Sequence, residues 1–263
     1  RRFGKSLTLD TIATLFETGV EPYFKGTWIY DKWTEPTYPV LRLNFLDLDK
    51  YSLEHFKQKL NAIISSFARD INVKNYEEKV EPEDTIYFLL DELRKEKRQI
   101  VILIDEYDCQ MTANINNETL YKQFQEKIKS FYANIKDKFA IKFLGITGVT
   151  RLKDVSIFSV GSDIRDITNS SAYSQMIGFT RDEIKKFYIY YLKLAASYEN
   201  NCNVDEVTDT QIESLLDRLA QNYDGYCFDE FYKKKVFSTW SVNKFFQSAV
   251  SNKFGFLSKI GVI

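Results

Sequence analysis

The residues in this chain best suited to chemistry are a Gly-Lys-Ser run at its start and an Asp-Glu pair further along. Gly4, Lys5 and Ser6 match the end of the phosphate-binding pattern G-x-x-x-x-G-K-[ST]. In that pattern backbone N–H groups at a helix N-terminus face the phosphates, the lysine neutralises the β and γ oxygens, and the hydroxyl holds Mg²⁺. The first glycine of the pattern would precede Arg1, so the tripeptide alone is weak evidence.

The acidic pair stands at the end of an apolar run. Asp105 and Glu106 follow Ile100–Ile104, five apolar residues that predict a strand buried on both faces of a parallel sheet. We assign Asp105 to Mg²⁺ and Glu106 to the water that attacks a phosphate. Taken alone, such a pair is more often a helix cap or a loop. Together with a Gly-Lys-Ser turn that opens a helix, it predicts a nucleotide site.

A third polar segment follows the next apolar strand. Thr147, Thr150 and Arg151 lie in the sequence GITGVTR, just past Leu144. We expect a polar sensor here beside the γ-phosphate, and we assign Thr147 and Arg151 to catalysis and Thr150 to nucleotide binding. Leu7, next to the Gly-Lys-Ser run, is also assigned to nucleotide binding. The alternative is a turn with a surface arginine, and the residues leave both open.

The periodicity of apolar residues predicts the elements that position these groups. Spacings of three and four predict helices at 6–17, 52–71, 84–97 and 120–135. Apolar runs predict buried strands at 37–48, 100–104 and 139–147. This alternation indicates an α/β fold with a parallel sheet flanked by helices. Helical stripes dominate after Gly178, so we predict an α/β core over 1–178 and a helical subdomain over 179–263.

We also expect a strand that leads into the Gly-Lys-Ser turn. It would lie at the centre of the sheet, between the strand that ends at Thr147 and one that ends near Gly178. No such strand stands upstream of Gly4 in this sequence. The expectation is therefore that the natural protein has about 20 or more further residues before Arg1, including an apolar strand of about five or six residues.

Composition argues against several other classes of function. The net charge of −1 over 263 residues does not support nucleic-acid binding through bulk charge. The three cysteines form no C-x-x-C pattern, and the single histidine, His55, excludes a histidine-rich metal site. No stretch approaches the roughly 18 apolar residues that a membrane helix needs, so we expect no membrane partner.

Five motifs, in their order along the chain, make the interpretation specific: RRFGKSLTL, IVILIDEYD, GITGVTRLKDVSIFS with RDIT after it, GFTRDEI, and NYDGYCF. They resemble the AAA-ATPase-like domain that often precedes a PD-(D/E)XK nuclease-type domain, and the resemblance covers nearly the whole chain. It implies a P-loop NTPase fold of the ASCE/AAA type with a C-terminal helical lid. ATP and Mg²⁺ would be its ligands.

The resemblance also implies roles for single residues. Gly4, Lys5 and Ser6 fall on the Walker A motif, the Asp105–Glu106 pair on Walker B, and Thr147 or Thr150 on the sensor. Asp224 belongs to the YDGY motif, which would face the nucleotide from the lid. The implied function is a slowly hydrolysing, ATP-dependent switch for an effector domain outside this sequence, of the nuclease type. Such a protein would be cytoplasmic, or a secreted effector that acts in a host cytoplasm, and a homo-oligomer stays open.

Departures from the family pattern favour an alternative. The family usually has arginine after YDGY, whereas this chain has Cys227. A missing cation near the γ-phosphate would weaken hydrolysis, so the second hypothesis is a degenerate, non-hydrolysing interaction or scaffold module of the same fold. No nuclease signature follows residue 230, and we interpret Phe228–Lys233 as a solvated loop.

Overall fold

The structure is a computed structural model that describes residues 2–135, 139–150, 164–223 and 226–251. The chain divides into two compact units. The first, here called the sheet unit, is Ser6–Ile164. The second, the helical unit, is Arg165–Ile263 together with Arg1–Lys5. The predicted residues Arg151 and Asp224 lie outside the described residues.

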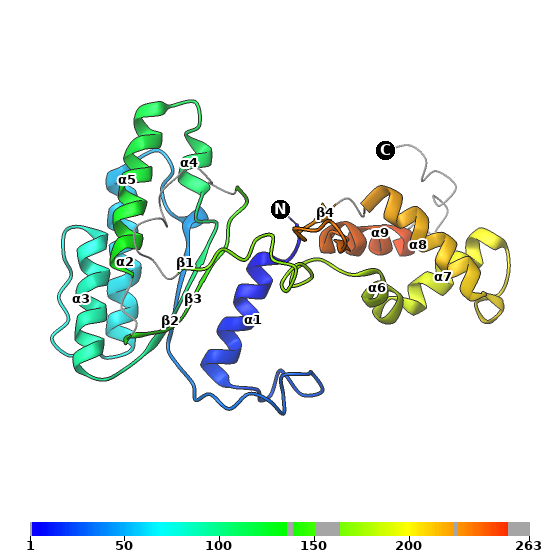
Figure 1. The fold of residues 1–263 in the computed structure, drawn as a ribbon, viewed down its shortest axis with the longest axis horizontal. Coiled ribbons are helices and arrows are strands. Elements are labelled where there is room, and N and C mark those ends of the chain that lie inside the picture. The colour runs from blue at the N-terminus through cyan, green and yellow to red at the C-terminus, as the bar shows by residue number, and fades with distance from the viewer. Residues whose placement is uncertain (1, 136–138, 151–163, 224–225, 252–263) are drawn as a thin grey trace. The chain divides into compact units, whose positions relative to one another are not determined.

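The described residues of the sheet unit form a three-stranded parallel sheet covered by helices on both faces (Figure 1). Its elements are α1 (Lys5–Thr18), β1 (Val40–Asn44), η1 (Phe45–Asp47), α2 (Leu53–Asp70), α3 (Pro82–Lys95), β2 (Ile100–Asp105), α4 (Cys109–Ala113), α5 (Glu118–Asn134) and β3 (Ile141–Ile146). The strand order is β1-β2-β3, with parallel pairing on both sides of β2. The predicted mixed α/β fold with a parallel sheet is confirmed.

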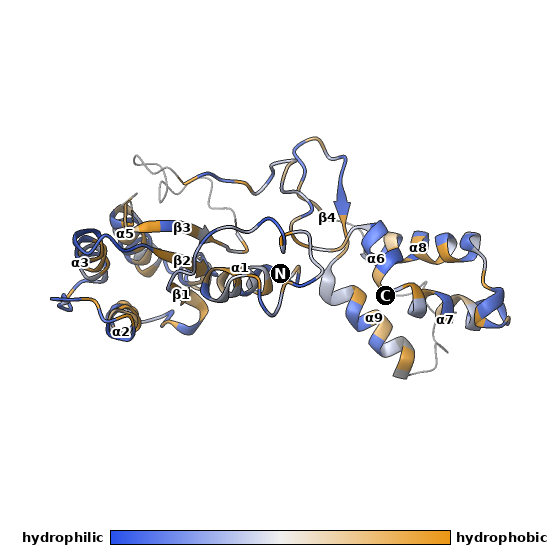
Figure 2. Ribbon diagram, turned by 90° about the horizontal axis from the view of Figure 1, so that it is seen from below, coloured by the Kyte–Doolittle hydropathy of each residue, from blue (hydrophilic) through white to orange (hydrophobic). Residues whose placement is uncertain are grey.

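The central strand β2 is apolar throughout because both of its faces are covered. Ile100, Ile102 and Ile104 belong to the core that α2, α3 and α5 form on one face. Val101 and Leu103 pack on the other face, with α1. Residues in a strand alternate between faces, so the sequence of a strand covered on both sides is an unbroken apolar run. The hydrophobic character of β2 is visible in Figure 2.

Strand β3 differs from its prediction as a buried strand. All six of its residues are partly or fully exposed, and Phe143 is 38% exposed. Within the described residues β3 pairs with β2 alone, so one of its edges carries no neighbouring strand. The expectation of a strand ending near Gly178 is wrong for the described part of the chain, because 164–178 forms turns and bends.

The helical unit has its own apolar core. Its elements are α6 (Arg181–Phe187), α7 (Ile189–Asn200), η2 (Val204–Glu206), α8 (Asp209–Tyr223), β4 (Tyr226–Cys227), β5 (Lys235–Val236) and α9 (Thr239–Ser251). Buried residues of α7, α8 and α9 form one cluster, in which Leu192, Leu216 and Val242 are fully enclosed. β4 and β5 pair as a short antiparallel hairpin.

The loop between β4 and β5 is exposed over most of its length, as the sequence predicted, but Asp229 within it is buried. Asp229 is 4% exposed and accepts hydrogen bonds from Ser171 Oγ at 2.6 Å and from three backbone N–H groups, those of Phe231, Lys233 and Lys234. A buried carboxylate is tolerated only when its oxygens are satisfied in this way. These donors, Ser171 first, hold the pKa of Asp229 below its ordinary value, against the opposing effect of burial.

Asp229 therefore makes the stability of the protein depend on pH. Its pKa is lower in the folded protein than the unfolded value of about 3.9, so its carboxylate stabilises the fold above that pH, and the effect is lost as pH falls through the folded pKa. We expect Asp229→Asn to melt below the parent protein at pH 7 and the difference to shrink as pH falls below about 3.9. Thermal unfolding followed by circular dichroism measures this. Asp205→Asn, at an exposed carboxylate of the same unit, is the control and should melt like the parent.

Candidate functional site

Three polar side chains meet at the carboxyl end of β2. Ser6 Oγ donates to Asp105 Oδ2 at 2.5 Å, and Thr147 Oγ1 donates to Asp105 Oδ1. The backbone N–H of Glu106 also donates to Asp105 Oδ1, at 2.9 Å. Ser6 lies in the first turn of α1 and Thr147 directly follows β3. The structure thus brings together residues that the sequence places in three separate motifs.

The parallel register explains why these residues meet. Ile104 lies opposite Ile146 in the sheet, and the N–H of Thr147 donates to the Ile104 carbonyl at 2.8 Å, which extends the pairing one residue past β3. The carboxyl ends of β2 and β3 therefore coincide. Thr147 follows directly, beside Asp105.

Helix α1 is fixed on the sheet by apolar packing and by ion pairs. Leu9, Ala13 and Phe16 form its buried side and contact the face of β2 opposite to α2 and α5. On the solvent side, Arg42 of β1 pairs with Asp10 and Glu17 of α1. Such exposed pairs contribute little stability each, at most about 1 kcal/mol. The apolar contacts therefore carry most of the attachment, and they hold the first turn of α1 near Asp105.

Glu106 occupies an unusual backbone conformation. Its φ is 52°, in the left-handed region that residues other than glycine rarely adopt. Such a conformation costs on the order of 1–3 kcal/mol and persists where surrounding contacts impose it, often at functional sites. Here it turns the chain sharply after β2. Its assignment as the residue that activates water stays a prediction.

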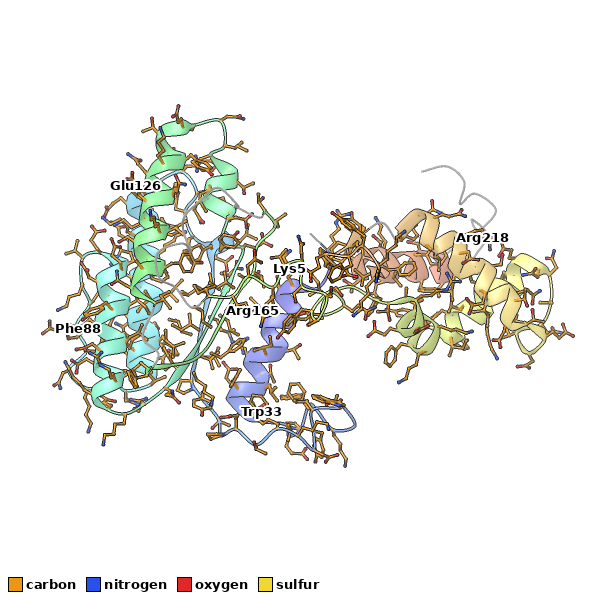
Figure 3. The ribbon with its side chains drawn as sticks, in the orientation of Figure 1. Lys5, Trp33, Phe88, Glu126, Arg165 and Arg218 are labelled. Carbon is orange, nitrogen blue, oxygen red and sulfur yellow. The ribbon has the colours of Figure 1, made fainter. Side chains whose placement is uncertain are left out.

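The remaining predicted residues lie at the start of α1 and in the segment after β3. Gly4 has a φ of 88°, which suits glycine, and Lys5 is the first residue of α1, as labelled in Figure 3. Leu7 follows in the first turn and is 69% exposed. Thr150 is exposed, and its backbone N–H donates to Asp108 Oδ2 at 2.6 Å. Their contacts with a nucleotide stay predictions.

Asp108 is a residue of this region that sequence reasoning missed. It is 2% exposed and accepts backbone hydrogen bonds from the segment after β3. The only signal in the sequence is a second aspartate three positions after Asp105, in IDEYD. Such a residue is ordinarily taken for a helix cap, and Asp108 does stand at the N-cap of α4 without its side chain capping the helix.

The oxygen atoms at the site fit Mg²⁺ in type. Mg²⁺ prefers hard oxygen ligands and keeps several waters, with one or two carboxylates and substrate phosphates completing its shell. The Ser6 hydroxyl and the Asp105 carboxylate present such oxygens at one place. In the described part of the chain no group of three or more His, Cys, Asp or Glu side chains gathers as a metal cage.

An α/β sheet with polar side chains at its carboxyl edge is an arrangement that nucleotide-binding domains use. Comparison with known families agrees: the chain belongs to the AAA-ATPase-like family, described as predicted AAA-ATPases, which matches residues 1–158. Membership supports a nucleotide-binding domain with ATP as its ligand. No helix among the described residues has the length and apolar character to cross a membrane.

One curated relative is described as an uncharacterized protein in the vnfD 5′ region of Azotobacter chroococcum mcd 1. It is 31% identical over 191 residues, which cover 70% of this chain and 36% of the relative. The chain thus spans little more than a third of that protein's length. No solved structure shows significant similarity to the chain.

The position of Asp105 predicts a magnesium-dependent effect on binding. Asp105→Asn keeps the volume of the side chain and removes its charge, so we expect ATP affinity in the presence of Mg²⁺ to fall about tenfold or more, which is roughly 1.4 kcal/mol. Affinity measured by calorimetry in EDTA should change much less. Asp70→Asn, at the exposed end of α2, is the matched control. Equal losses with and without Mg²⁺ would contradict a metal-holding role.

Proposed function

We propose that this domain binds ATP with Mg²⁺ at the carboxyl edge of its sheet and hydrolyses it slowly. The observation that carries the proposal is the hydrogen bond between Ser6 and Asp105, which lie 99 residues apart in the sequence. In the Walker A and Walker B interpretation these are the two residues that hold the same metal ion. Two separately predicted motifs therefore meet as the hypothesis requires.

Each residue has a role in this proposal. The backbone around Gly4 and the start of α1 receive the phosphates, and Lys5 neutralises the β and γ oxygens. Ser6 and Asp105 would hold Mg²⁺, which when bound would supply positive charge beside the phosphates. Glu106 accepts a proton from the attacking water.

The segment after β3 and the lid supply the remaining roles. Thr147 orients the γ-phosphate or the water as the sensor, Thr150 contacts the nucleotide, and Arg151 takes part in catalysis. Leu7 contacts the nucleotide from the first turn of α1. Asp224 belongs to the lid motif of the family. The strand order supports an ASCE/AAA-type arrangement, since the acidic strand β2 lies beside the polar-ended strand β3.

Contacts of the N-terminal residues with the start of α9, within the helical unit, favour a switch. The carbonyl of Arg2 accepts hydrogen bonds at the start of α9, from Ser238 Oγ at 3.1 Å, Thr239 Oγ1 at 3.0 Å and the Trp240 N–H at 3.2 Å. Phe3 is 5% exposed, and its ring contacts the ring of Tyr226 with centroids 4.5 Å apart. The two residues directly before Gly4 are thus built into the helical unit.

This attachment gives phosphate binding a route to α9. A phosphate held at Gly4–Ser6 restrains the backbone directly after Arg2 and Phe3. The carbonyl of Arg2 caps α9, and the ring of Phe3 packs on Tyr226 of β4. We therefore propose that the helical unit acts as the lid and that α9 transmits the nucleotide state to an effector domain, which the family resemblance suggests is of the nuclease type.

A second candidate is the non-hydrolysing module of the same fold. Cys227 stands where the family usually has a lid arginine, and its thiol donates to the Lys234 carbonyl at 3.2 Å, within the β4–β5 hairpin. No cation is supplied by this position. Phosphate release from the purified protein separates the two candidates. Measurable release supports the hydrolysing domain, whereas ATP binding without release, or no binding, favours the module.

Two variants should fail in different ways. Lys5→Ala removes the charge on the β and γ oxygens, so ATP affinity should fall about tenfold or more, roughly 1.4 kcal/mol. Glu106→Gln keeps the volume but removes the base, so affinity should stay within about threefold while turnover falls about 10²–10⁴-fold. Calorimetry and phosphate release measure both. Lys25→Ala and Glu118→Gln, at exposed positions, are the matched controls. A Glu106→Gln protein as active as the parent would show that the base is another residue.

The switch has its own test in hydrogen exchange. Adding ATP and Mg²⁺ to the parent should change the exchange of α9 amides, because nucleotide restrains the backbone that caps the helix. Lys5→Ala at the same nucleotide concentration should show a smaller change. Helix α3, far along the sequence from the capping contact, is the internal control. Unchanged α9 exchange at saturating ATP would show that the nucleotide state does not reach this helix.

A further inference from the structure

The side chain of Asp108 is a buried carboxylate, and its partners among the described residues lie within the sheet unit. Its Oδ1 accepts from the Val149 N–H at 3.1 Å and its Oδ2 from the Thr150 N–H at 2.6 Å. Thr112 Oγ1 lies 3.4 Å from the same Oδ2, a weaker contact. A carboxylate that is only 2% exposed is costly unless donors satisfy it. Here the donors are two backbone N–H groups of one loop.

Tyr107, the residue before Asp108, holds the same loop at its two ends. Its N–H donates to the Thr147 carbonyl at 3.1 Å, and its hydroxyl donates to the Thr150 carbonyl at 2.9 Å. The loop 147–150 is therefore bonded to two consecutive residues at four points. Hydrogen bonds to a charged acceptor are the stronger kind, so Asp108 supplies the firmer pair.

The loop also lies too close to these residues to carry a side chain at its second position. A Cβ added to Gly148 would stand 2.4 Å from Cε1 of Tyr107 and 2.6 Å from Asp108 Oδ1. Contacts of that length do not occur between real side chains, so the loop or the ring would have to move. Gly148 thus permits the close approach on which the hydrogen bonds to Asp108 depend.

We propose that Asp108 is a positioning residue that holds the 147–150 loop and thereby keeps the Thr147 hydroxyl on Asp105. Thr147 is the first residue of the loop, and its Oγ1 donates to the carboxylate that Ser6 also contacts. If the loop is released, the Thr147 hydroxyl is no longer fixed there, whereas Lys5 and Ser6 keep their place on α1. The effect on ATP rests on the proposed function, and it predicts a larger loss of turnover than of binding.

The experiment replaces Asp108 with asparagine. The amide offers one acceptor oxygen where the carboxylate offers two, and its NH₂ group faces a backbone N–H. We expect exchange of the Val149 and Thr150 amide protons, followed by NMR without nucleotide, to become about tenfold faster or more. With nucleotide, ATP affinity should stay within about threefold of the parent while turnover falls about tenfold or more.

Two further variants make the test specific. Gly148→Ala leaves Asp108 intact but displaces the loop, so it should reproduce both effects, and it serves if Asp108→Asn does not fold. Thr112→Val removes the 3.4 Å contact with Asp108 on the α4 side and should behave like the parent. Circular dichroism confirms the fold of each variant before the other measurements.

The outcomes separate this proposal from the proposed function. Unchanged amide exchange of Val149 and Thr150 in Asp108→Asn would overturn the proposal that Asp108 holds the loop, whatever the protein does with ATP. Equal losses of affinity and turnover would also overturn it, because they would indicate general damage to the fold. A parent protein that does not hydrolyse ATP would overturn the proposed hydrolysis, and the exchange measurement would still decide whether Asp108 holds the loop.

Discussion

The carboxylate of Asp105 joins the three elements that form the site. It accepts hydrogen bonds from Ser6, from Thr147 and from the backbone of Glu106. A carboxylate has about four acceptor positions, so this one group satisfies donors from α1, from the segment after β3 and from its own chain. The requirement is geometric, because a one-residue shift of α1 would move Ser6 by about 1.5 Å along the helix axis and rotate it by about 100°. Element lengths and register must therefore agree to within one residue.

Packing on the two faces of β2 fixes the positions of these elements relative to one another. On one side α2, α3 and α5 contribute a continuous core, with Phe45 and Phe124 fully buried in it. On the other side α1 is the helix that covers β2, through Leu9, Ala13 and Phe16. The face with several helices fixes the sheet as a rigid body, whereas the attachment of α1 is smaller. The helix that carries Ser6 is consequently held by fewer contacts than the strand that carries Asp105.

Sequence patterns predicted the parts of this site that depend on local order. A Gly-Lys-Ser turn before an apolar stripe and an acidic pair after a buried strand are contiguous in the chain, so Ser6 and Asp105 were found without the fold. The predicted positions of β1, β2 and β3 were right to within a few residues for the same reason. The exposure of β3 was not predictable in this way, since it depends on which strands pair with it and not on its own residues.

The buried carboxylates show the other limit. Asp108 takes its backbone partners from a distant loop, Val149 and Thr150 being 41 and 42 residues away. Asp229 accepts from Ser171, 58 residues away, and from three N–H groups of its own loop. The partners are mostly backbone N–H groups, which every residue but proline carries, so no residue type reveals them. Without those partners a lone aspartate is expected at the surface. Only the folded chain shows that these two carboxylates organise loops.

The turn at Glu106 connects the site at Asp105 with the 147–150 loop that Asp108 holds. In a continuing strand the side chains of Asp105 and Glu106 would point to opposite faces of the sheet, and the chain would run on past the end of β3. The left-handed φ of Glu106 instead turns the chain back, so that the N–H of Tyr107 reaches the Thr147 carbonyl. The hydrogen bonds of Tyr107 and Asp108 with the 147–150 loop offset the strain of that turn. Since the strained residue and the residues that stabilise it are adjacent, the four residues of DEYD hold their shape as one unit, and the loop after β3 is part of what keeps Glu106 in place.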